Sequence, residues 1–153
     1  MIDFRKVELE IPGTLLLHSM PGWMEPFEAC FQELENASIQ RIICLNPLKE
    51  VQDKSPEYAA AIRNETLPCE WVHFPIGNVG VPEDKKAFLE LAEQTAEQLK
   101  HGENILVHCK GGVGRTGTFA SGVTAALGQP LSRVTDAGGK AETDQQRALI
   151  AEL

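Results

Sequence analysis

Short apolar runs alternate with longer segments of mixed polarity along this chain, and the runs have the length of strands. Four runs rich in β-branched, leucine or aromatic residues predict buried strands, at 15–17, 39–45, 71–76 and 105–107. Pro12-Gly13 separates the first run from a weaker one and predicts a hairpin-like turn. Because proline cannot donate a hydrogen bond to a sheet, Pro75 places the third run at a sheet edge or at a strand end.

Apolar positions at three- and four-residue spacing predict helices between and after these strands. The expected helices cover 26–34, 57–64, 84–100, 118–127 and 142–153. The polar segment 47–56 contains two prolines and predicts a loop, and 129–141 predicts a loop or a short helical turn. Strands that alternate with helices predict one α/β domain over residues 1–153, with a central mixed sheet flanked by helices on both faces.

The segment 105–118 combines a buried strand, a glycine-rich loop and the start of a helix. His108-Cys109 ends the strand, three glycines follow within the next five residues, and Arg115-Thr116 closes the loop. A strand, a tight glycine loop and a helix N-terminus in this order align backbone N–H groups that can hold an anion. The sequence therefore predicts an anion site built on this loop.

The residue types of this loop fit covalent chemistry on a phosphate ester. Inward N–H groups near a helix N-terminus favour the thiolate of Cys109, and the thiolate is the nucleophilic form of cysteine. The planar guanidinium of Arg115 can bind two phosphate oxygens at once. Thr116 can donate its hydroxyl to the sulfur when the sulfur leaves. We expect a two-step reaction through a phosphocysteine.

Two other interpretations of the loop stay open. The glycines could form only a tight connection, with Cys109 as a small buried residue. The nucleotide-binding P-loop also joins a strand to a helix, but it needs a glycine where Cys109 stands and a lysine where Arg115 stands. The P-loop interpretation therefore fails at two of its fixed positions.

Composition narrows the classes of partner and the setting. The net charge of −8 argues against nucleic acid or an anionic membrane as the main partner, because both require a basic surface. We expect no secretory signal and no membrane span. The four cysteines show no metal-ligand spacing, and free thiols predict a reducing, cytoplasmic setting, with Cys30 and Cys44 in the core.

The stretch His108-Cys109-Lys110-Gly111-Gly112-Val113-Gly114-Arg115-Thr116-Gly117 resembles the signature loop of the cysteine-based protein tyrosine phosphatase superfamily. Its sequence is most similar to that of small dual-specificity phosphatases of the cyclin-dependent-kinase-inhibitor-3-like group. The resemblance implies that Cys109 is the nucleophile, Arg115 the phosphate clamp and Thr116 the residue that assists the leaving thiolate. His108 would help to keep the thiolate poised. The phosphate-binding residues would be Lys110, Gly111, Gly112, Val113, Gly114 and Arg115, with no metal and no cofactor.

The chain departs from this family at the expected proton donor. Relatives carry an Asp two residues after a Phe-Pro-Ile sequence, whereas Phe74-Pro75-Ile76 is followed by Gly77-Asn78. An amide cannot deliver the proton that the leaving oxygen needs. Asp84 is the preferred substitute and Glu83 the second, although both residues also suit the start of a helix. The catalytic set predicted from the sequence is therefore Cys109, Arg115, Thr116 and Asp84.

The final segment adds weaker similarities to the family. Thr143 and Gln146 match a Glu-Thr-x-x-Gln pattern, in which Gln146 could place water for the second step or could be a surface residue. Arg133 is a candidate for an arginine that relatives carry upstream of this helix.

The leading prediction is a phosphomonoester hydrolase, specifically a tyrosine or dual-specificity protein phosphatase. Its partner would be a phosphorylated protein or a small phosphoester. The alternatives are a phosphate-binding pseudophosphatase, suggested by Asn78, and a phosphatase of phosphoinositides or other non-protein phosphoesters. Lys110 is the only basic residue between Cys109 and Arg115, which weighs against the lipid alternative. The substrate and the oligomeric state cannot be predicted from the sequence.

Overall fold

A mixed sheet of five strands forms the centre of the computed structural model, which describes residues 2–77 and 80–153. The strand order is β1-β2-β5-β3-β4; β1 pairs antiparallel with β2, and the other neighbours pair in parallel. The strands are β1 (Arg5–Val7), β2 (Thr14–His18), β3 (Arg41–Cys44), β4 (Glu70–His73) and β5 (Asn104–His108). The strand with the deepest burial, β5, lies in the middle of the sheet and leads into the glycine-rich loop.

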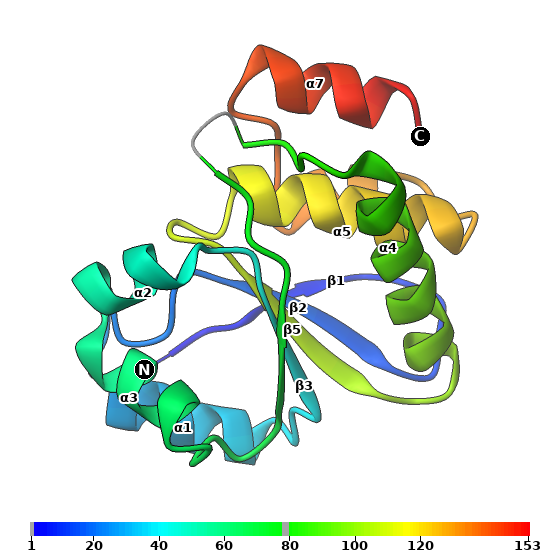
Figure 1. Cartoon of the computed structure of the whole chain (residues 1–153). Coiled ribbons are helices and arrows are strands. Elements are labelled where there is room, and N and C mark those ends of the chain that lie inside the picture. The colour runs from blue at the N-terminus through cyan, green and yellow to red at the C-terminus, as the bar shows by residue number, and fades with distance from the viewer. Residues whose placement is uncertain (1, 78–79) are drawn as a thin grey trace.

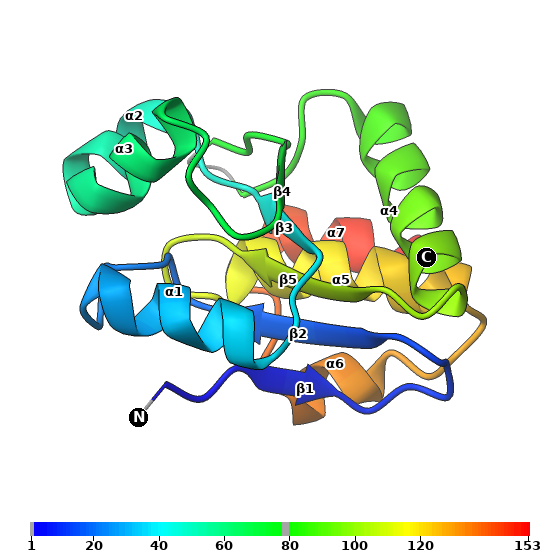
Figure 2. The ribbon, with the colours of Figure 1, turned by 90° about the horizontal axis from the view of Figure 1, so that it is seen from below.

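Seven helices surround the sheet in the described part of the chain (Figures 1 and 2). They are α1 (Phe27–Asn36), α2 (Leu48–Lys54), α3 (Pro56–Arg63), α4 (Lys85–Lys100), α5 (Gly114–Ala126), α6 (Ser132–Asp136) and α7 (Asp144–Ala151). Figure 2 shows α1 on one side of the strands and α4, α5 and α7 on the other. The central mixed sheet with helices on both faces confirms the predicted α/β fold.

Alternate positions of the central strands point to opposite faces of the sheet, as the two-residue period of a strand requires. On one face, Leu15, Leu17 and Val107 pack with side chains of α4 and α5, including Phe88 and Phe119. On the other face, apolar strand residues pack with Leu34 of α1; these residues are Leu16, Ile42 and Leu106. Both faces of the parallel strands are therefore buried, which explains their continuous apolar runs.

The structure corrects the prediction for residues 47–56, which do not form a loop. Helix α2 occupies Leu48–Lys54, and Pro56 is the first residue of α3. Both prolines that suggested a loop stand where a helix starts, since Pro47 is the N-cap of α2 and a missing N–H costs little at that end. Helix α2 buries only Val51, so its sequence carries a weak helical pattern.

Other element predictions are confirmed with small shifts. The hairpin around Pro12-Gly13 joins β1 to β2, and β4 lies at the edge of the sheet, as Pro75 indicated. The terminal helix begins at Asp144, capped by the side chain of Thr143, which accepts from the N–H of Gln146. Among the described residues, no helix has the length and apolarity needed to span a bilayer.

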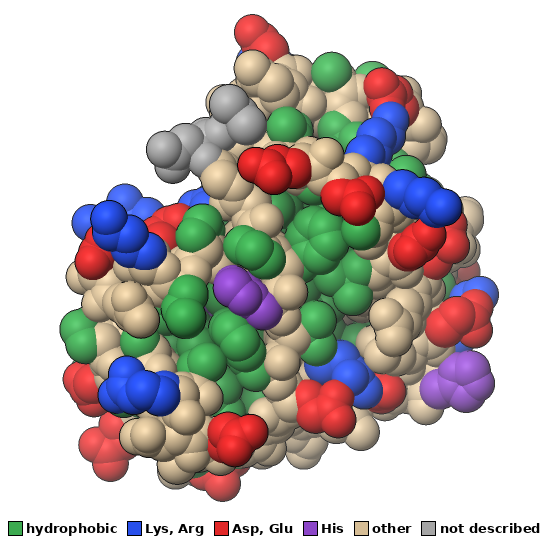
Figure 3. All heavy atoms as spheres, in the orientation of Figure 1, with side chains coloured by type: hydrophobic (Ala, Val, Ile, Leu, Met, Phe, Trp, Pro, Cys, Tyr) green, Lys and Arg blue, Asp and Glu red, His purple; other side chains and the backbone are tan. Residues whose placement is uncertain are grey.

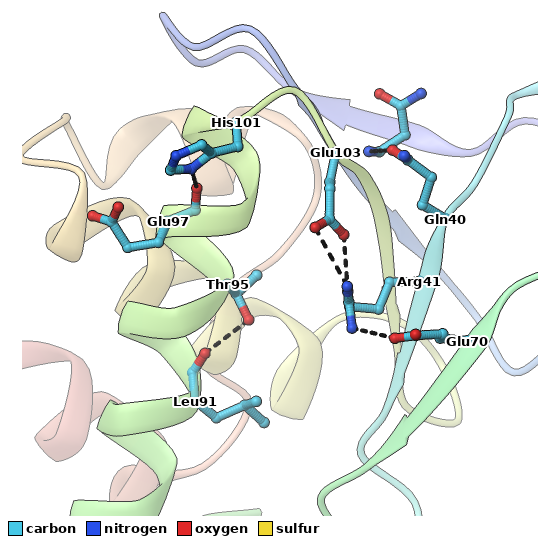
Figure 4. Close-up of polar contacts among 9 residues, drawn as sticks. Gln40, Arg41, Glu70, Leu91, Thr95, Glu97, His101 and Glu103 are labelled. Atoms are coloured by element: carbon cyan, nitrogen blue, oxygen red, sulfur yellow. Dashed lines mark hydrogen bonds and ion pairs between the residues drawn. The ribbon is translucent and has the colours of Figure 1, made fainter.

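An ion cluster joins strands at the amino-terminal end of the parallel sheet (Figure 4). Arg41 donates from Nε to Glu103 Oε1 at 2.9 Å and from Nη2 to Glu103 Oε2 at 3.3 Å. The same guanidinium donates from Nη1 to Glu70. Next to it, the backbone N–H of Asn104 donates to Gln40 Oε1 at 2.8 Å. This cluster ties the starts of β3, β4 and β5 together.

Candidate active site

The carboxyl ends of the four parallel strands meet on one edge of the sheet and each contributes a segment to one cavity. In the strand register, His18, His108, Cys44 and His73 lie side by side at these ends. The segments that follow the strands line a cavity of about 720 Å³. Residues from all four segments line it, including Trp23 after β2, Glu50 after β3, Gly77 after β4 and Cys109 after β5. Ligand sites at this edge are the rule for α/β sheets.

In the glycine-rich loop, residues outside the loop bind the backbone carbonyls, and the N–H groups point away from these residues. Met20 N–H donates to Lys110 O at 2.9 Å, and Arg5 Nη2 donates to Gly112 O at 2.6 Å. In a trans peptide the carbonyl and the next N–H point in opposite directions, so these bonds direct the N–H groups of Gly111 and Val113 away from their partners. Among the described residues, no backbone carbonyl accepts from the N–H groups of residues 110–113.

The far side of the loop is fixed in the same way and continues into α5. Val113 O accepts from Gly117 N–H at 2.8 Å and from Lys140 N–H at 3.1 Å. Helix α5 begins at Gly114, so its first N–H groups and the positive end of its dipole lie beside the loop. The arrangement is a cradle of backbone donors suited to an anion with several oxygens.

Gly112 is the position where this loop requires a glycine. Its φ of +73° lies in the left-handed region that side chains disfavour. A Cβ there would also lie 2.4 Å from the backbone oxygen of His18. The loop therefore approaches the end of β2 too closely for any other residue.

His108 is fully buried, and both of its ring nitrogens form hydrogen bonds. Its Nδ1 lies 3.0 Å from Cys109 O, and its Nε2 lies 2.7 Å from the hydroxyl of Tyr58, which accepts from Trp71 Nε1 at 3.1 Å. A carbonyl can only accept, so Nδ1 carries the proton and Nε2 accepts from Tyr58. Burial lowers the pKa of His108 to about 4, which keeps the ring neutral. A neutral ring with both nitrogens bonded fixes the backbone at the start of the loop.

Arg115 is held at the cavity by a carboxylate and a carbonyl. Nη1 donates to Glu50 Oε2 at 3.1 Å and to Ile76 O at 2.9 Å, and Nη2 donates to Glu50 Oε1 at 2.9 Å. Burial acts to lower the pKa of Arg115, but Glu50 and Cys109 outweigh burial and raise it. Burial acts to raise the pKa of Glu50, and Arg115 together with Asn46 and Lys110 brings it below its ordinary value. Both groups are therefore charged at neutral pH.

Two of the three catalytic residues predicted from the loop, Cys109 and Arg115, line the cavity, together with Lys110 and Gly111. Gly112, Val113, Gly114 and Thr116 are not part of this lining. Thr116 is fully buried at the first turn of α5, and its hydroxyl has no hydrogen-bond partner among the described residues, which is rare for a buried hydroxyl. The role of Thr116 in assisting the leaving thiolate stays a prediction.

The rim of the cavity carries both charges and an aromatic ring. Lys110 Nζ lies 5.0 Å from the ring centroid of Trp23, within the range of a cation–π contact. Helix α2 adds Lys49 and Lys54 to the lining, together with the acidic residues Glu50 and Asp53. In Figure 3, basic side chains lie beside acidic ones over the part of the surface that α2 forms. The cavity lining thus mixes basic and acidic side chains, Glu142 among the acidic ones, in a protein of net charge −8.

The proposed proton donors lie apart from this cavity, and Asn78 lies outside the described residues. Asp84 is the N-cap of α4, and its carboxylate accepts from Ala87 N–H at 3.0 Å. Asp84 and Glu83 line a neighbouring cavity that shares Gly77 with the one around Cys109. The expected helix start at this position is confirmed, and the proton-donor role of Asp84 stays a prediction.

Gln146 is buried rather than on the surface, and it connects α7 to the 77–84 segment. Its Nε2 donates to Gly80 O at 3.1 Å, and its Oε1 accepts from Glu142 N–H at 2.7 Å. Gln146 and Glu142 both line the cavity, so α7 closes one of its walls. Arg133 is partly exposed and donates to Glu8 O at 2.6 Å, and it is not part of this lining.

One group of possible metal ligands lies beside the site. Nitrogen, oxygen and sulfur atoms of His18, Glu25 and Cys30 come within 4.8 Å of one another. His18 Nε2 lies 2.5 Å from Glu25 Oε1, so these two residues already satisfy each other. Burial raises the pKa of Cys30 to about 12, which keeps the thiol protonated. The group is better explained as a hydrogen-bonded pair beside a core cysteine.

Comparison with known protein families gives a match over nearly the whole chain. The family model described as "Swiss Army Knife protein, DSP-PTPase phosphatase domain" matches residues 5–151. The chain is also 31% identical over 100 residues to the protein named Putative tyrosine phosphatase 067L of Invertebrate iridescent virus 3. That match covers 63% of the chain and 36% of the viral protein, so the chain spans about a third of that relative's length.

Solved structures of phosphatases share the fold at low sequence identity. A kinase associated phosphatase with its catalytic-site cysteine replaced by serine aligns with a TM-score of 0.80 and 20% identity, over 99% of this chain and 93% of that one. PTPMT1 aligns at 0.69 and 17%, over 98% and 92%. The human tyrosine phosphatase-like serine/threonine/tyrosine-interacting protein aligns at 0.67 and 18%, over 93% and 91%. At these identities the likeness shows the common fold.

Proposed function

Because the chain belongs to the family of the DSP-PTPase phosphatase domain of Swiss Army Knife proteins, we propose that it hydrolyses phosphomonoesters through a phosphocysteine intermediate at Cys109. The family makes it a cysteine-based tyrosine or dual-specificity phosphatase. The observation that carries the residue assignment is the shared cavity of Cys109 and Arg115, in which Glu50 and Ile76 O hold the guanidinium. Residues 1–153 act as one catalytic domain in this proposal.

In the first step, the thiolate of Cys109 attacks the phosphorus, an S–P bond forms, and the P–O bond to the leaving group breaks. The N–H groups of Lys110, Gly111, Gly112, Val113 and Gly114 and the guanidinium of Arg115 bind the three non-bridging oxygens. Preorganised donors of this kind stabilise the charge of the transition state without reorganising. The leaving oxygen takes a proton from an acid, for which we propose Asp84.

In the second step, water attacks the phosphocysteine, inorganic phosphate is released, and the electron pair of the S–P bond returns to sulfur. Thr116 donates its hydroxyl to the departing thiolate, which is consistent with its buried and otherwise unpartnered oxygen. Gln146 has both ends of its amide engaged, so any role in placing water would require it to release Gly80 or Glu142.

Replacement of Cys109 by serine tests the covalent route. We expect Cys109→Ser to lower turnover of para-nitrophenyl phosphate on the order of 10⁴-fold or more, as loss of a nucleophile does elsewhere. Cys69→Ser is the matched control, because Cys69 is a free thiol outside the cavity. Retained turnover in Cys109→Ser would refute the covalent route. A wild-type protein that binds phosphate without turnover would be a pseudophosphatase.

Replacement of Asp84 by asparagine tests the proton donor without loss of the helix cap. Asparagine is as good an N-cap as aspartate, so Asp84→Asn retains α4. We expect turnover of phenyl phosphate, whose leaving group needs a proton, to fall about 10²–10⁴-fold. Para-nitrophenyl phosphate, with a better leaving group, should lose less. Glu83→Gln is the control, and equal rates in both variants and the wild type would leave Asp84 as a helix cap only.

A phosphorylated protein, with phosphotyrosine or mixed specificity, is the substrate class we propose first. The second candidate is a phosphoinositide, because Lys49, Lys54 and Lys110 line the cavity and could bind further phosphate groups. PTPMT1, a structural neighbour, has been solved in complex with PI(5)P. Turnover of phosphopeptides and of soluble phosphoinositides at matched concentrations separates the two classes.

We also propose a reducing, cytoplasmic setting. This is supported by four free cysteines, of which Cys109 must stay reduced to act. The proposed route uses neither a metal nor another cofactor.

A further inference from the structure

Arg5 of the edge strand β1 reaches the glycine-rich loop from outside the site. Its Nη2 lies 2.6 Å from Gly112 O and its Nη1 lies 3.2 Å from Ala137 O. The guanidinium is half-buried, and its two nitrogens bridge the loop to the end of α6. Among the described residues, Arg5 is the charged side chain that donates to a carbonyl of the loop between Cys109 and Val113, since His108, which donates to Cys109 O, is neutral.

The contact restrains the orientation of one peptide of the loop. The carbonyls of Lys110 and Val113 accept from backbone N–H groups, whereas Gly112 O accepts from Arg5. Glycine has little intrinsic preference between positive and negative φ, so the bond from Arg5 helps to select the conformation of Gly112, whose φ is +73°. With Gly112 O held outward, the N–H of Val113 points to the opposite side of the peptide plane.

We propose that Arg5 is a positioning residue of the phosphate-binding loop: it holds the Gly112–Val113 peptide with the Val113 N–H directed to the phosphate. The inference rests on the proposed function, because it concerns the same loop. It predicts that β1, although outside the cavity lining, is part of the anion-binding apparatus.

Three variants test the proposal. Arg5→Met removes the charge and both donors, Arg5→Lys retains the charge but replaces the two donor nitrogens of the planar guanidinium by a single nitrogen, and Lys6→Met removes an exposed charge from the same strand. The readouts are the Kd of orthovanadate as a phosphate analogue, and kcat and KM for para-nitrophenyl phosphate. Far-ultraviolet circular dichroism and a thermal melt establish that each variant is folded.

We expect Arg5→Met to weaken orthovanadate binding by about 10- to 100-fold, which is the range for losing a hydrogen bond to a charged group. For para-nitrophenyl phosphate, kcat should fall more than KM rises. Arg5→Lys should bind orthovanadate with intermediate affinity. Lys6→Met should match the wild type.

The proposal is wrong if folded Arg5→Met has the orthovanadate Kd of Lys6→Met. If Arg5→Met does not fold, Arg5→Lys decides, because an unchanged orthovanadate Kd there would exclude a role for the two-nitrogen contact. Orthovanadate binding needs no turnover. A wild-type protein without phosphatase activity would therefore contradict the proposed function while the role of Arg5 would still be tested.

Discussion

Two arginines are held by carboxylates at opposite ends of the same parallel strands, and they differ in their other partners. Arg41, at the start of β3, donates to Glu103 and Glu70, so two carboxylates engage its guanidinium (Figure 4). Arg115, at the start of α5, donates to one carboxylate, that of Glu50, and to one carbonyl. Arg115 also lines the same cavity as Cys109, whose negative charge acts to raise the pKa of Arg115.

The difference comes from the direction of the strands. At the amino-terminal end, the segments that enter β3, β4 and β5 present side chains that pair with one another. At the carboxyl-terminal end, the strands lead into a glycine-rich loop and a helix start, whose backbone donors attract a further anion. The same type of ion pair thus has a structural role at one end and prepares a cation for substrate at the other.

Exchange of each arginine for lysine gives the largest expected effect. Lysine keeps the charge but loses the planar fork, so Arg115→Lys should lower kcat for para-nitrophenyl phosphate by about 10³-fold, the lower range for an arginine that stabilises phosphoryl transfer. Arg41→Lys should leave kcat within about twofold, since its guanidinium lies at the other end of the sheet. A comparable loss in Arg41→Lys would remove the distinction between the two ends.

Replacement of Glu50 by glutamine should have a smaller effect on turnover. The neutral amide offers one acceptor oxygen in place of two, so the guanidinium of Arg115 is less firmly oriented. We expect kcat to fall about 10- to 100-fold, the equivalent of one charged hydrogen bond. Steady-state kinetics with Glu103→Gln as the matched control would check this, and equal activity of the two variants would contradict it.

Much of this architecture follows from local pattern, and the part that does not follow has a physical reason. The strands, the 84–100 helix and the loop from Cys109 to Arg115 were predicted because their residues satisfy a strong local period or a strong motif. Helix α2 was missed because it buries Val51 alone and its flanking prolines also suit a loop. Because Glu50 lies on α2, its pairing with Arg115 could not be predicted either, although the sequence places this carboxylate shortly after a strand.

Contacts between segments that are distant along the chain could not be predicted from the sequence. Arg5 and Gly112 are 107 positions apart, and nothing in the sequence around Arg5 indicates a loop carbonyl as its partner. Gln146 was recognised from its motif, but its burial between Gly80 and Glu142 depends on how α7 packs. Such contacts require the tertiary arrangement and cannot be read from period or propensity.

The buried imidazole of His108 should make the stability of the protein depend on pH. Because burial lowers the pKa of His108 from 6.5 to about 4, the unfolded state binds more protons than the folded state between these values. The free energy of unfolding should therefore fall as the pH drops from about 6.5 to about 4. Urea titrations at several pH values should show that the free energy of unfolding of His108→Gln depends less on pH than that of the wild type. A variant of the exposed His101 should retain the pH dependence of the wild type.

Replacement of Glu103 by glutamine should have the smallest effect and test the amino-terminal end by itself. The side chains of Arg41 and Glu103 are 21% and 23% exposed, so solvent screens part of their attraction, and Glu70 can still pair with Arg41 in the variant. We expect the free energy of unfolding to fall by up to about 1 kcal/mol, with no change in kcat. Urea unfolding and para-nitrophenyl phosphate turnover of the same preparation measure both. A lower kcat at unchanged stability would mean that the ion pair at the start of β5 influences the loop at its end, and the two arginines would then belong to one coupled system rather than to two independent ones.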